Sequence, residues 1–396
     1  MCNECDSTAY PVAVNYSKVN ISHFIRNVKR KGDIKMAHSV LTVDIRDKAD
    51  FDNGHISGSV NMTAQQLMQY DLDANCEVVV VCRNGRASEA AAEQLRQKGV
   101  DARSLDGGYS KWLFDSIDGS DRSREIEQSI RKKFARPIWS RFARAIIKYE
   151  LVKPGDRIAV CISGGKDSML LAKLFQELKA HNKFDFELRF LVMDPGYSAV
   201  NRSLIQKNAG ILGIPIEIFE TNIFNSVFNV RNNPCYLCAR MRRGHLYNKA
   251  KEMGCNKIAL GHHYDDVIET ILMGMIYGGQ VQTMMPKLHS ANFEGMQLIR
   301  PMYLIREAEI KRWRDYNDLH FLQCACRFTE ENTAVGQSGE SDSKRLEIKH
   351  LIAELKQRNP QIEANIFRSV ENVNLNTIIS YKKNGEITHF LDGYND

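Results

Sequence analysis

The sequence lacks any apolar run approaching the roughly 18–20 residues that a membrane-spanning helix needs. Its first residues, Met1-Cys-Asn-Glu-Cys-Asp-Ser7, also lack the basic and then apolar regions of a secretory signal peptide. No internal repeat is visible along the chain. We therefore expect a cytoplasmic protein that has no contact with a membrane and works in a reducing compartment.

The bulk composition indicates a multidomain globular protein. A chain of 396 residues is too long for one ordinary core, so two or three domains are expected. Hydrophobic residues make up 43% and charged residues 26%, as in soluble globular proteins. The ten cysteines, in a reducing compartment, favour metal ligation or thiol chemistry over a disulfide framework. The pair Cys2 and Cys5 near the N-terminus has no assigned role.

The positive charge is concentrated in one stretch. Nine basic residues lie between Arg122 and Lys148, against the two acidic residues Glu125 and Glu127. Clustered charge of this kind favours nucleic-acid binding, although a solvated helix face is the plainer interpretation. Aromatic residues are interleaved with the cations, and they are either part of that surface or the buried side of the helix: Phe134, Trp139 and Phe142.

Two series of short apolar runs alternate with helix-like stretches. The first series holds 41–45 and 77–82, and the second holds 157–162, 188–193, 216–219 and 257–260. Such alternation is typical of α/β domains with a mostly parallel sheet, where ligands bind beyond the carboxyl ends of the strands. The expected segments are an N-terminal extension (1–37), a parallel-sheet domain (38–114), a linker with a basic helix (115–150), a doubly wound domain (151–332), and a mobile loop, helix and hairpin (333–396).

Cys82 stands where a strand is expected to end, and Arg83-Asn-Gly-Arg-Ala-Ser88 lead into a helix. Backbone N–H groups in such a loop, together with the helix N-terminus, stabilise an anion, so a cysteine there is a candidate nucleophilic thiolate. The alternative is a buried structural cysteine at the end of a strand.

Residues 38–113 resemble a rhodanese domain. The resemblance rests on Asp44-Ile-Arg-Asp47, Gly54-His-Ile-Ser-Gly58, the loop from Cys82 to Ser88, and Leu105-Asp-Gly-Gly-Tyr-Ser-Lys-Trp112. That family carries a persulfide on the loop cysteine, so the resemblance implies a catalytic, sulfur-carrying Cys82. Ala87 departs from the pattern, because many members place an arginine there.

A second loop, 163–168, also follows an expected strand and opens a helix, without the Gly-x-x-x-x-Gly-Lys-Ser spacing of a Walker loop. Its glycines let backbone N–H groups approach phosphates, its serines donate hydroxyl bonds, and its lysine supplies a cation. The aspartate either holds magnesium or begins the helix. The candidate nucleotide-binding residues are Ser163, Gly164, Gly165, Lys166, Asp167 and Ser168.

This loop resembles the signature of the N-type ATP pyrophosphatases (PP-loop enzymes). Those enzymes cleave ATP between the α- and β-phosphates and adenylate a carbonyl-type oxygen. The resemblance implies ATP and Mg²⁺ as cofactors, with Met193 and Asp194 beside the adenine and ribose. It also implies that Gly261 and an aspartate, Asp265 or Asp266, reach the phosphates or the magnesium.

Cys235-Tyr-Leu-Cys238 brings two thiolates onto one turn, a spacing that suits a metal ion or an iron–sulfur cluster. Together with the basic residues that follow, with Gly261-His-His263 and with Ile299-Arg-Pro301, this stretch resembles the tRNA 2-thiocytidine synthetase family over about residues 130–370. In that family three cysteines hold a 4Fe-4S cluster. The resemblance implies Cys235 and Cys238 as ligands, with Cys324 as the third and Cys326 as its rival. A zinc site closed by all four cysteines is the main alternative.

The two resemblances together imply ATP-dependent tRNA thiolation. Cys82 would take sulfur from a cysteine desulfurase or another persulfide or sulfide donor, and pass it to the cluster or its cysteines. The PP-loop would adenylate O2 of a tRNA pyrimidine, with cytidine 32 implied, and sulfur would replace AMP. The candidate contacts to RNA phosphates, which position rather than specify, are Arg240, Arg242, Arg243, Lys132 and Lys133.

Four other interpretations stay open at this point. The same chemistry could act on a tRNA uridine or on a small molecule. The chain could be a zinc-containing sulfur-relay protein with a vestigial PP-loop, or an amidating pyrophosphatase that uses ammonia. A homodimer is a further expectation.

Overall fold

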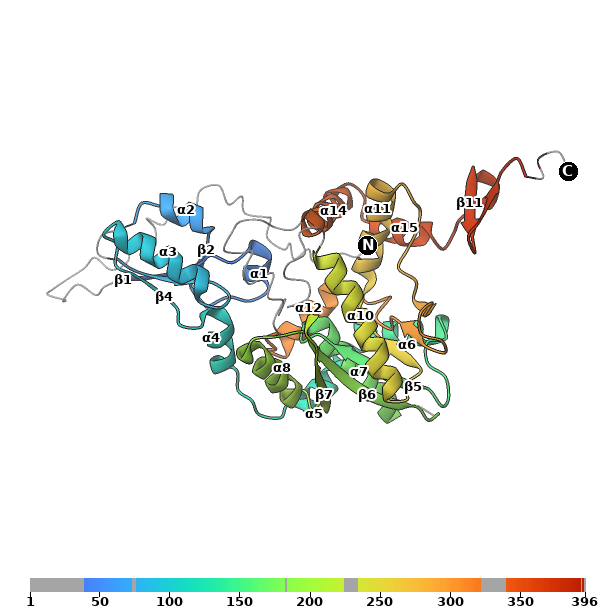
Figure 1. Ribbon diagram of the computed structural model, residues 1–396, viewed down its shortest axis with the longest axis horizontal. Coiled ribbons are helices and arrows are strands. Elements are labelled where there is room, and N and C mark those ends of the chain that lie inside the picture. Colours follow the sequence, from blue (N-terminus) through green and yellow to red (C-terminus); the bar gives the residue numbers. More distant parts are fainter. Residues whose placement is uncertain are drawn as a thin grey trace, which may run out of the picture. The chain divides into compact units, whose positions relative to one another are not determined.

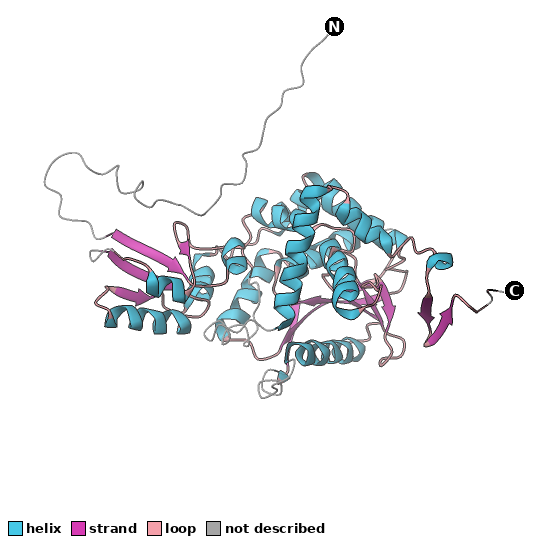
Figure 2. Cartoon of the chain, turned by 90° about the horizontal axis from the view of Figure 1, so that it is seen from above, coloured by secondary structure: helices cyan, strands magenta, loops and turns pink. Residues whose placement is uncertain are grey.

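The computed structural model describes residues 39–72, 76–181, 184–223, 234–321, 340–392 and 394. Its strands form a four-stranded sheet, a six-stranded sheet and a terminal hairpin, drawn as three groups of magenta arrows in Figure 2. Helices connect the strands within both larger sheets, which confirms the predicted α/β fold class. Among the described residues, no helix is long and apolar enough to cross a membrane.

The four-stranded sheet has the order β2-β1-β3-β4. Its strands are β1 (Ser39–Asp44), β2 (Val60–Asn61), β3 (Cys76–Val81) and β4 (Ala102–Ser104). The pairs β1–β2 and β3–β4 are parallel, as the alternation predicts. Four helices accompany the strands: α1 (Lys48–Asp52), α2 (Ala64–Gln69), α3 (Arg86–Gln97) and α4 (Gly108–Ser116). Strand β3 is a run of valines buried at its carboxyl end, so the residues that follow it are held in place by the core.

The six-stranded sheet has the order β7-β6-β5-β8-β10-β9. Its strands are β5 (Arg157–Ile162), β6 (Glu187–Asp194), β7 (Ile216–Glu220), β8 (Lys257–Ala259), β9 (Lys287–His289) and β10 (Gln297–Ile299). The first four match the predicted strands closely. Strands β9 and β10 were not predicted, and β9 runs antiparallel to β10 at the edge of an otherwise parallel sheet. Strand β9 holds one apolar residue, Leu288, and β10 holds two, so neither shows the apolar run by which strands are recognised from sequence.

Helices cover both faces of this sheet (Figure 1). On β5, Ile158, Val160 and Ile162 pack in one core cluster with α7 (Lys166–His181). Ala159 and Cys161, which point to the opposite face, pack in another cluster with residues of α10 (Pro234–Glu252). The remaining helices of this part are α8 (Ala199–Ile211), α11 (Tyr264–Gly278) and α12 (Glu307–Tyr316). A doubly wound arrangement follows, with the loops at the carboxyl ends of the strands left to form a site.

The predicted basic helix consists of three pieces: α5 (Ser123–Lys132), a π-helical turn η3 (Ala135–Trp139), and α6 (Ser140–Lys148). Phe134 and Phe142 are buried in the core of the PP-loop part, so these two aromatics are the inner side of the element. The C-terminal part contains α14 (Glu340–Arg358), α15 (Ile362–Ser369), a 3-10 turn η4 (Leu375–Thr377), and a hairpin of β11 (Ser380–Lys383) and β12 (Glu386–His389). The predicted helix and hairpin are thereby confirmed.

Candidate active site

The PP-loop leaves the carboxyl end of β5 and closes on itself through its two serines. The Ser168 hydroxyl accepts a hydrogen bond from the Ser163 backbone N–H at 3.1 Å and donates to the Gly165 carbonyl at 3.0 Å. Gly164 has φ +88°, and a Cβ there would lie 2.6 Å from Ile205 Cγ1. Only glycine fits this position, because the left-handed backbone and the close neighbour both exclude a side chain. The loop therefore presents its backbone, with α7 starting directly behind it.

Lys166 lies between two carboxylates. Its ammonium lies 3.0 Å from Asp167 Oδ2 and 3.3 Å from Glu307 Oε1. Burial alone would lower the pKa of Lys166, but Asp167 and Glu307 outweigh it and raise the pKa. The lysine is thus a fixed positive charge at the loop, as the sequence predicts. Glu307, at the first turn of α12, was not predicted, because nothing in its sequence context marks it.

Glu307 is the most strongly shifted carboxylate of the site. Burial would raise the pKa of Glu307, yet Lys166, Lys349 and Lys311 oppose it and the pKa falls to about 2. Lys349 comes from α14, where Arg345 also reaches inward to Glu269 at 2.8 Å and to Asp266 at 3.4 Å. The C-terminal helix therefore supplies two cations to the acidic side of the site, a contribution that the sequence did not reveal.

The segment after β8 lies against the PP-loop. A Cβ on Gly261 would sit 3.2 Å from the Asp167 carbonyl carbon and from the Ser168 nitrogen, so the absence of a side chain permits the approach. Asp266 accepts from the His263 backbone N–H at 2.9 Å and so caps α11. Burial would raise the pKa of Asp266, but His263 and Arg345 reverse this and lower it. Asp265 instead accepts from the Glu307 backbone N–H at 2.7 Å, which ties α11 to α12.

Two buried polar atoms at this site have no hydrogen-bond partner: Asp167 Oδ1 and His263 Nδ1. Asp167 Oδ1 lies 4.0 Å from His263 Nε2, too far for a hydrogen bond. Buried polar groups are normally paired, so an orphaned carboxylate oxygen beside a phosphate-type loop indicates a group that binds there.

Met193 and Asp194 lie at the carboxyl end of β6, both buried. Asp194 Oδ1 accepts from the backbone N–H groups of Gly196 and Tyr197 at 2.9 and 2.7 Å, and Oδ2 lies 3.4 Å from Arg202. This carboxylate therefore shapes the turn that follows β6. Its backbone stays on the same sheet edge as the PP-loop, where the sequence predicts the adenine and ribose.

Histidine 262 and Arg300 form a further pair at the ends of β8 and β10. Burial first, and the Arg300 charge second, lower the pKa of His262 to about 4, so its ring is neutral at physiological pH. Arg300 Nε lies 3.3 Å from His262 Nδ1. Burial also lowers the pKa of Arg300, to about 10. Arg300 belongs to the Ile299-Arg-Pro301 motif, but its role was not predicted.

Cys82 directly follows β3, and its sulfur is surrounded by donors. The backbone N–H groups of Gly85 and Ser88 each lie 3.2 Å from Sγ, and the Ser88 hydroxyl lies 3.1 Å from it. Gly108 closes the loop from behind, since a Cβ there would lie 2.5 Å from the Cys82 carbonyl oxygen. The loop therefore directs backbone and hydroxyl donors at the Cys82 sulfur at the start of α3.

The two arginines of the Cys82 loop have different roles. Arg83 is buried and ion-paired with Asp50, whereas Arg86 is exposed at the first position of α3. Ala87 is partly buried against the core of this sheet. The charge of Arg83 is thus compensated by Asp50. The groups left to stabilise the sulfur are the backbone N–H groups that converge on it.

Of the predicted cluster ligands, the structure describes only the backbones of Cys235 and Cys238. Helix α10 begins at Pro234, so the backbones of Cys235 and Cys238 lie in its first turn, three residues apart. Their side chains, together with Cys324 and Cys326, lie outside the described residues, as do Cys2 and Cys5. Within the described part, no group of three metal-ligating side chains occurs. Arg240, Arg242 and Arg243 follow on the same helix.

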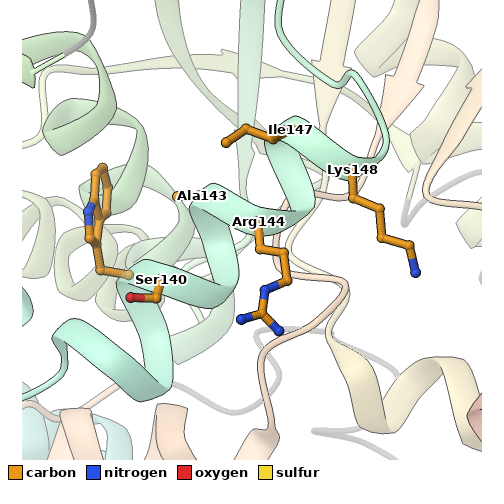
Figure 3. Close-up of a pocket in the computed structure, with 6 residues that line it drawn as sticks. Ser140, Ala143, Arg144, Ile147 and Lys148 are labelled. Carbon is orange, nitrogen blue, oxygen red and sulfur yellow. The ribbon is translucent and has the colours of Figure 1, made fainter.

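The basic element carries a surface groove of about 460 Å³ (Figure 3). Its walls are Trp139, Ser140, Ala143, Arg144, Ile147 and Lys148. Arg144 and Lys148 extend from one side of α6, and Lys148 is paired with Glu371. Lys132 and Lys133 are exposed nearby in sequence, with the Lys133 ammonium 4.2 Å from the centre of the Tyr316 ring.

Comparisons with known proteins agree with this geometry. A PP-loop domain model matches residues 135–326, and a rhodanese-like domain model matches residues 28–115. The tRNA-cytidine(32) 2-sulfurtransferase 1 of Francisella philomiragia is 34% identical over 233 residues, which are 58% of this chain and 87% of that protein. The corresponding protein of Pelobacter propionicus is 32% identical over 246 residues, 61% of this chain and 87% of its own length.

Among solved structures, the U34-tRNA thiolase NcsA from Methanococcus maripaludis, determined with its 4Fe-4S cluster, matches 67% of this chain and 80% of its own. Its sequence identity is 22% and its TM-score 0.45. The identity and coverage of the sulfurtransferase relatives carry the assignment. The chain therefore belongs to the tRNA-cytidine(32) 2-sulfurtransferase family, as an ATP-dependent sulfurtransferase with an additional rhodanese-like domain.

Proposed function

We propose that this protein thiolates tRNA, by adenylating O2 of a pyrimidine, cytidine 32, and replacing that oxygen with sulfur. The observation that carries the proposal is the presence in one chain of a loop built for phosphates, at Ser163–Ser168, and a loop built for an anionic sulfur, at Cys82. The names of the sulfurtransferase relatives support cytidine 32 as the target.

Adenylation makes the base oxygen a leaving group. The O2 atom attacks the α-phosphorus of ATP, and the bond to the β-phosphate oxygen breaks to release pyrophosphate. The PP-loop backbone and Lys166 would hold the departing pyrophosphate, because both offer positive charge where negative charge develops. Lys166 would exchange Glu307 and Asp167 for phosphate oxygens on binding ATP.

Mg²⁺ fits at Asp167. The unpartnered Oδ1 atom of Asp167 is an oxygen ligand of the kind that Mg²⁺ prefers, and it lies beside the loop that would hold the phosphates. Asp266 is the second candidate, because its Oδ2 lies 3.5 Å from Nδ1 of the same His263 ring whose Nε2 lies 4.0 Å from Asp167 Oδ1. Magnesium bound there would neutralise charge on the pyrophosphate.

Sulfur would reach the site through Cys82. A persulfide on its Sγ carries a terminal sulfur that is formally uncharged, so two electrons from an external thiol reductant are needed to release it as sulfide. The N–H groups of Gly85 and Ser88 would stabilise the Cys82 thiolate that remains. A cysteine desulfurase or another persulfide donor would reload the cysteine. Sulfur then attacks C2 of the adenylated base, the C2–O bond breaks, and AMP leaves with the oxygen.

Cys235 and Cys238 would hold a 4Fe-4S cluster with Cys324 as the third ligand, or with Cys326 in its place. The helical first turn of α10 suits such a pair, since residues three apart lie on one face of a helix. With three cysteine ligands, a cluster supplies one iron that is free to bind an external ligand.

The cluster assignment is tested by an anaerobic iron count on the full chain and on Cys324→Ala and Cys326→Ala. We expect a brown protein with about four irons, the number in a 4Fe-4S cluster, and loss of iron in only one of the two variants. A colourless protein that contains zinc instead would exclude the cluster and favour a sulfur relay.

The choice of substrate is tested separately. A salt-sensitive gel shift with a tRNA that carries cytidine 32 supports the proposal. No shift at low salt would favour a small-molecule substrate. If AMP release survives replacement of cytidine 32 but is lost on replacement of a uridine, the modified base is that uridine.

A further inference from the structure

One buried cation has no carboxylate partner among the residues that the structure describes. Among the described residues, five lysines and arginines are buried, and four of them form an ion pair with a carboxylate. The four pairs are Arg46–Asp44, Arg83–Asp50, Lys173–Glu127 and Lys257–Asp156. Arg300, which is only 7% exposed, forms no such pair with any described residue.

The hydrogen bonds of Arg300 go to neutral acceptors. Its Nε lies 3.3 Å from His262 Nδ1, and its Nη1 donates to the Met285 carbonyl. Asp266 acts on Arg300 only through space, and its own bonds go to the His263 backbone and to Arg345. Arg243 on α10 adds a second positive charge to the surroundings of Arg300.

Such an arrangement is costly for a resting protein. An ion taken from water loses several kcal/mol of hydration free energy, and the attraction of a well-placed counter-ion offsets about that much. A carboxylate offsets this cost for the other four buried cations, and none does so for Arg300. A guanidinium has five N–H donors in a planar fork, and neutral acceptors leave its charge uncompensated. An anion that binds beside Arg300 would supply the missing charge.

The hydrogen bond to His262 fixes a second donor next to the arginine. Because Arg300 Nε donates to Nδ1, the neutral ring carries its proton on Nε2. His262 follows Gly261, whose backbone lies against the start of α7 behind the PP-loop. Arg300 and His262 thus stand at the carboxyl ends of β10 and β8, at the same sheet edge as the PP-loop on β5.

We propose that Arg300, with His262 Nε2–H, binds a backbone phosphate of the RNA next to the nucleotide that is modified. The order of strands favours RNA over ATP as the source of the phosphate. ATP, as proposed above, extends from β6 to β5 and reaches the segment after β8 with its phosphates, whereas Arg300 follows β10, which lies one strand farther on in the sheet. This inference rests on the proposed tRNA substrate and adds a residue that positions it.

The test compares Arg300→Gln with the full-length wild-type chain. Binding of a fluorescent tRNA transcript with cytidine at position 32 is followed from 50 to 200 mM salt, and the ATP analogue AMPCPP with Mg²⁺ is titrated without RNA. We expect the slope of log K against log salt to become shallower by about 0.9, because one phosphate contact is lost. The dissociation constant of AMPCPP is expected to stay unchanged.

Two further variants separate charge from structure. Arg300→Lys keeps the positive charge without the fork, and is expected to keep the wild-type slope with weaker binding. Arg157→Gln removes an exposed arginine at the start of β5 that pairs with Glu187, and is expected to change neither measurement. An Arg300→Gln slope equal to that of the wild type would overturn the proposal. So would a tenfold weaker AMPCPP titration with an unchanged RNA slope, which would assign the site to ATP.

Wild-type crystals soaked in sodium tungstate give a test that does not depend on the folding of a variant. Tungstate has the shape and charge of a phosphate group, and the PP-loop serves as an internal control. We expect tungsten density within hydrogen-bond reach of Arg300, and an occupied PP-loop with no density at Arg300 would contradict the proposal. If the wild-type chain shows no salt-dependent tRNA binding at all, the proposed substrate itself fails, which is a distinct result.

Discussion

The Cys82 loop and the PP-loop use the same backbone plan for different anions. Each follows the carboxyl end of a buried strand, contains a glycine with positive φ, Gly85 or Gly164, and opens a helix. In the Cys82 loop the N–H groups of Gly85 and Ser88 already converge on a sulfur that belongs to the chain. In the PP-loop, the charged side chains pair with one another, with Lys166 between Asp167 and Glu307.

The difference lies in what the donors of each loop contact. In the Cys82 loop the backbone N–H groups contact a sulfur atom of the chain itself. The PP-loop instead holds Lys166 between carboxylates and leaves Asp167 Oδ1 without a partner. A strand–loop–helix unit thus provides anion binding in general, and the side chains decide whether the anion is a cysteine sulfur or a phosphate.

The largest expected effects come from inactivating one loop at a time. Lys166→Met is expected to lower tRNA-dependent AMP release by at least about 100-fold, the size of losing one group that stabilises transition-state charge. Its sulfur transfer from thiosulfate to cyanide is expected to survive. Cys82→Ala is expected to abolish that transfer and to keep AMP release when sodium sulfide supplies the sulfur. If either variant loses both activities, the two loops are not separable units.

Gly164→Ala is expected to destabilise the protein by about 2–3 kcal/mol and to weaken ATP binding. About 1 kcal/mol of this reflects the left-handed backbone, and the rest reflects the clash with Ile205. Gly155→Ala is the matched control, because Gly155 has φ +79° with nothing within 4 Å of its Cβ position. Urea unfolding of both variants separates the two effects. Equal losses would mean that Ile205 yields freely.

Glu307→Gln is expected to lower stability at pH 7 by on the order of 2 kcal/mol, because the folded state depresses the pKa of Glu307 to about 2. A depressed carboxyl pKa stabilises the protein above the unfolded value and loses that contribution as the pH falls through the folded value. The difference between wild type and variant should therefore shrink as pH drops from about 4.5 toward 2.

Urea unfolding at pH 7 and pH 3 measures this change. Glu354→Gln, which breaks an exposed pair with Arg358, serves as the control and is expected to cost under about 0.5 kcal/mol. If the difference in free energy of unfolding between wild type and Glu307→Gln stays constant between the two pH values, Lys166 and the other lysines do not depress the pKa of Glu307 as described.

The smallest effect is expected from Ser88→Ala. The change removes the hydroxyl 3.1 Å from Cys82 Sγ but leaves the Ser88 backbone N–H in place. One hydrogen bond contributes about 1 kcal/mol, so thiosulfate–cyanide transfer should fall by roughly fivefold. A loss as large as that of Cys82→Ala would show that the hydroxyl, and not the backbone, stabilises the sulfur.

Much of this architecture was predictable from local sequence. The β-branched runs at 77–82 and 157–162 and the glycines that follow them predict strand–loop–helix units, because their pattern reflects burial along the chain itself. The short strands β9 and β10 escaped prediction, since their pairing depends on neighbours distant in sequence. The π-helical turn at Ala135–Trp139 was likewise not visible in the pattern of charges.

The residues of the site also divide into those that local sequence predicts and those that it does not. Lys166, Asp167 and Cys82 lie within contiguous motifs and were predicted. Glu307, Arg345 and Arg300 come from three separate elements, and their importance arises only when the fold brings them to the sheet edge. An isolated charged residue in a sequence is usually solvated, so no sequence signal distinguishes Glu307 and Arg345 from the many exposed charges of the chain. Arg300 lies in the Ile299-Arg-Pro301 motif, which marks the segment but does not reveal what the side chain contacts.

The central claim is ATP-dependent replacement of a tRNA base oxygen by sulfur. The most direct measurement incubates the anaerobic full-length protein with ATP, Mg²⁺, sodium sulfide and a tRNA that carries cytidine 32, and analyses the nucleosides by mass spectrometry while AMP is quantified. The account predicts 2-thiocytidine and AMP in equal amounts, and neither product from Lys166→Met. AMP formation without any thiolated nucleoside, or thiolation without ATP, would contradict it.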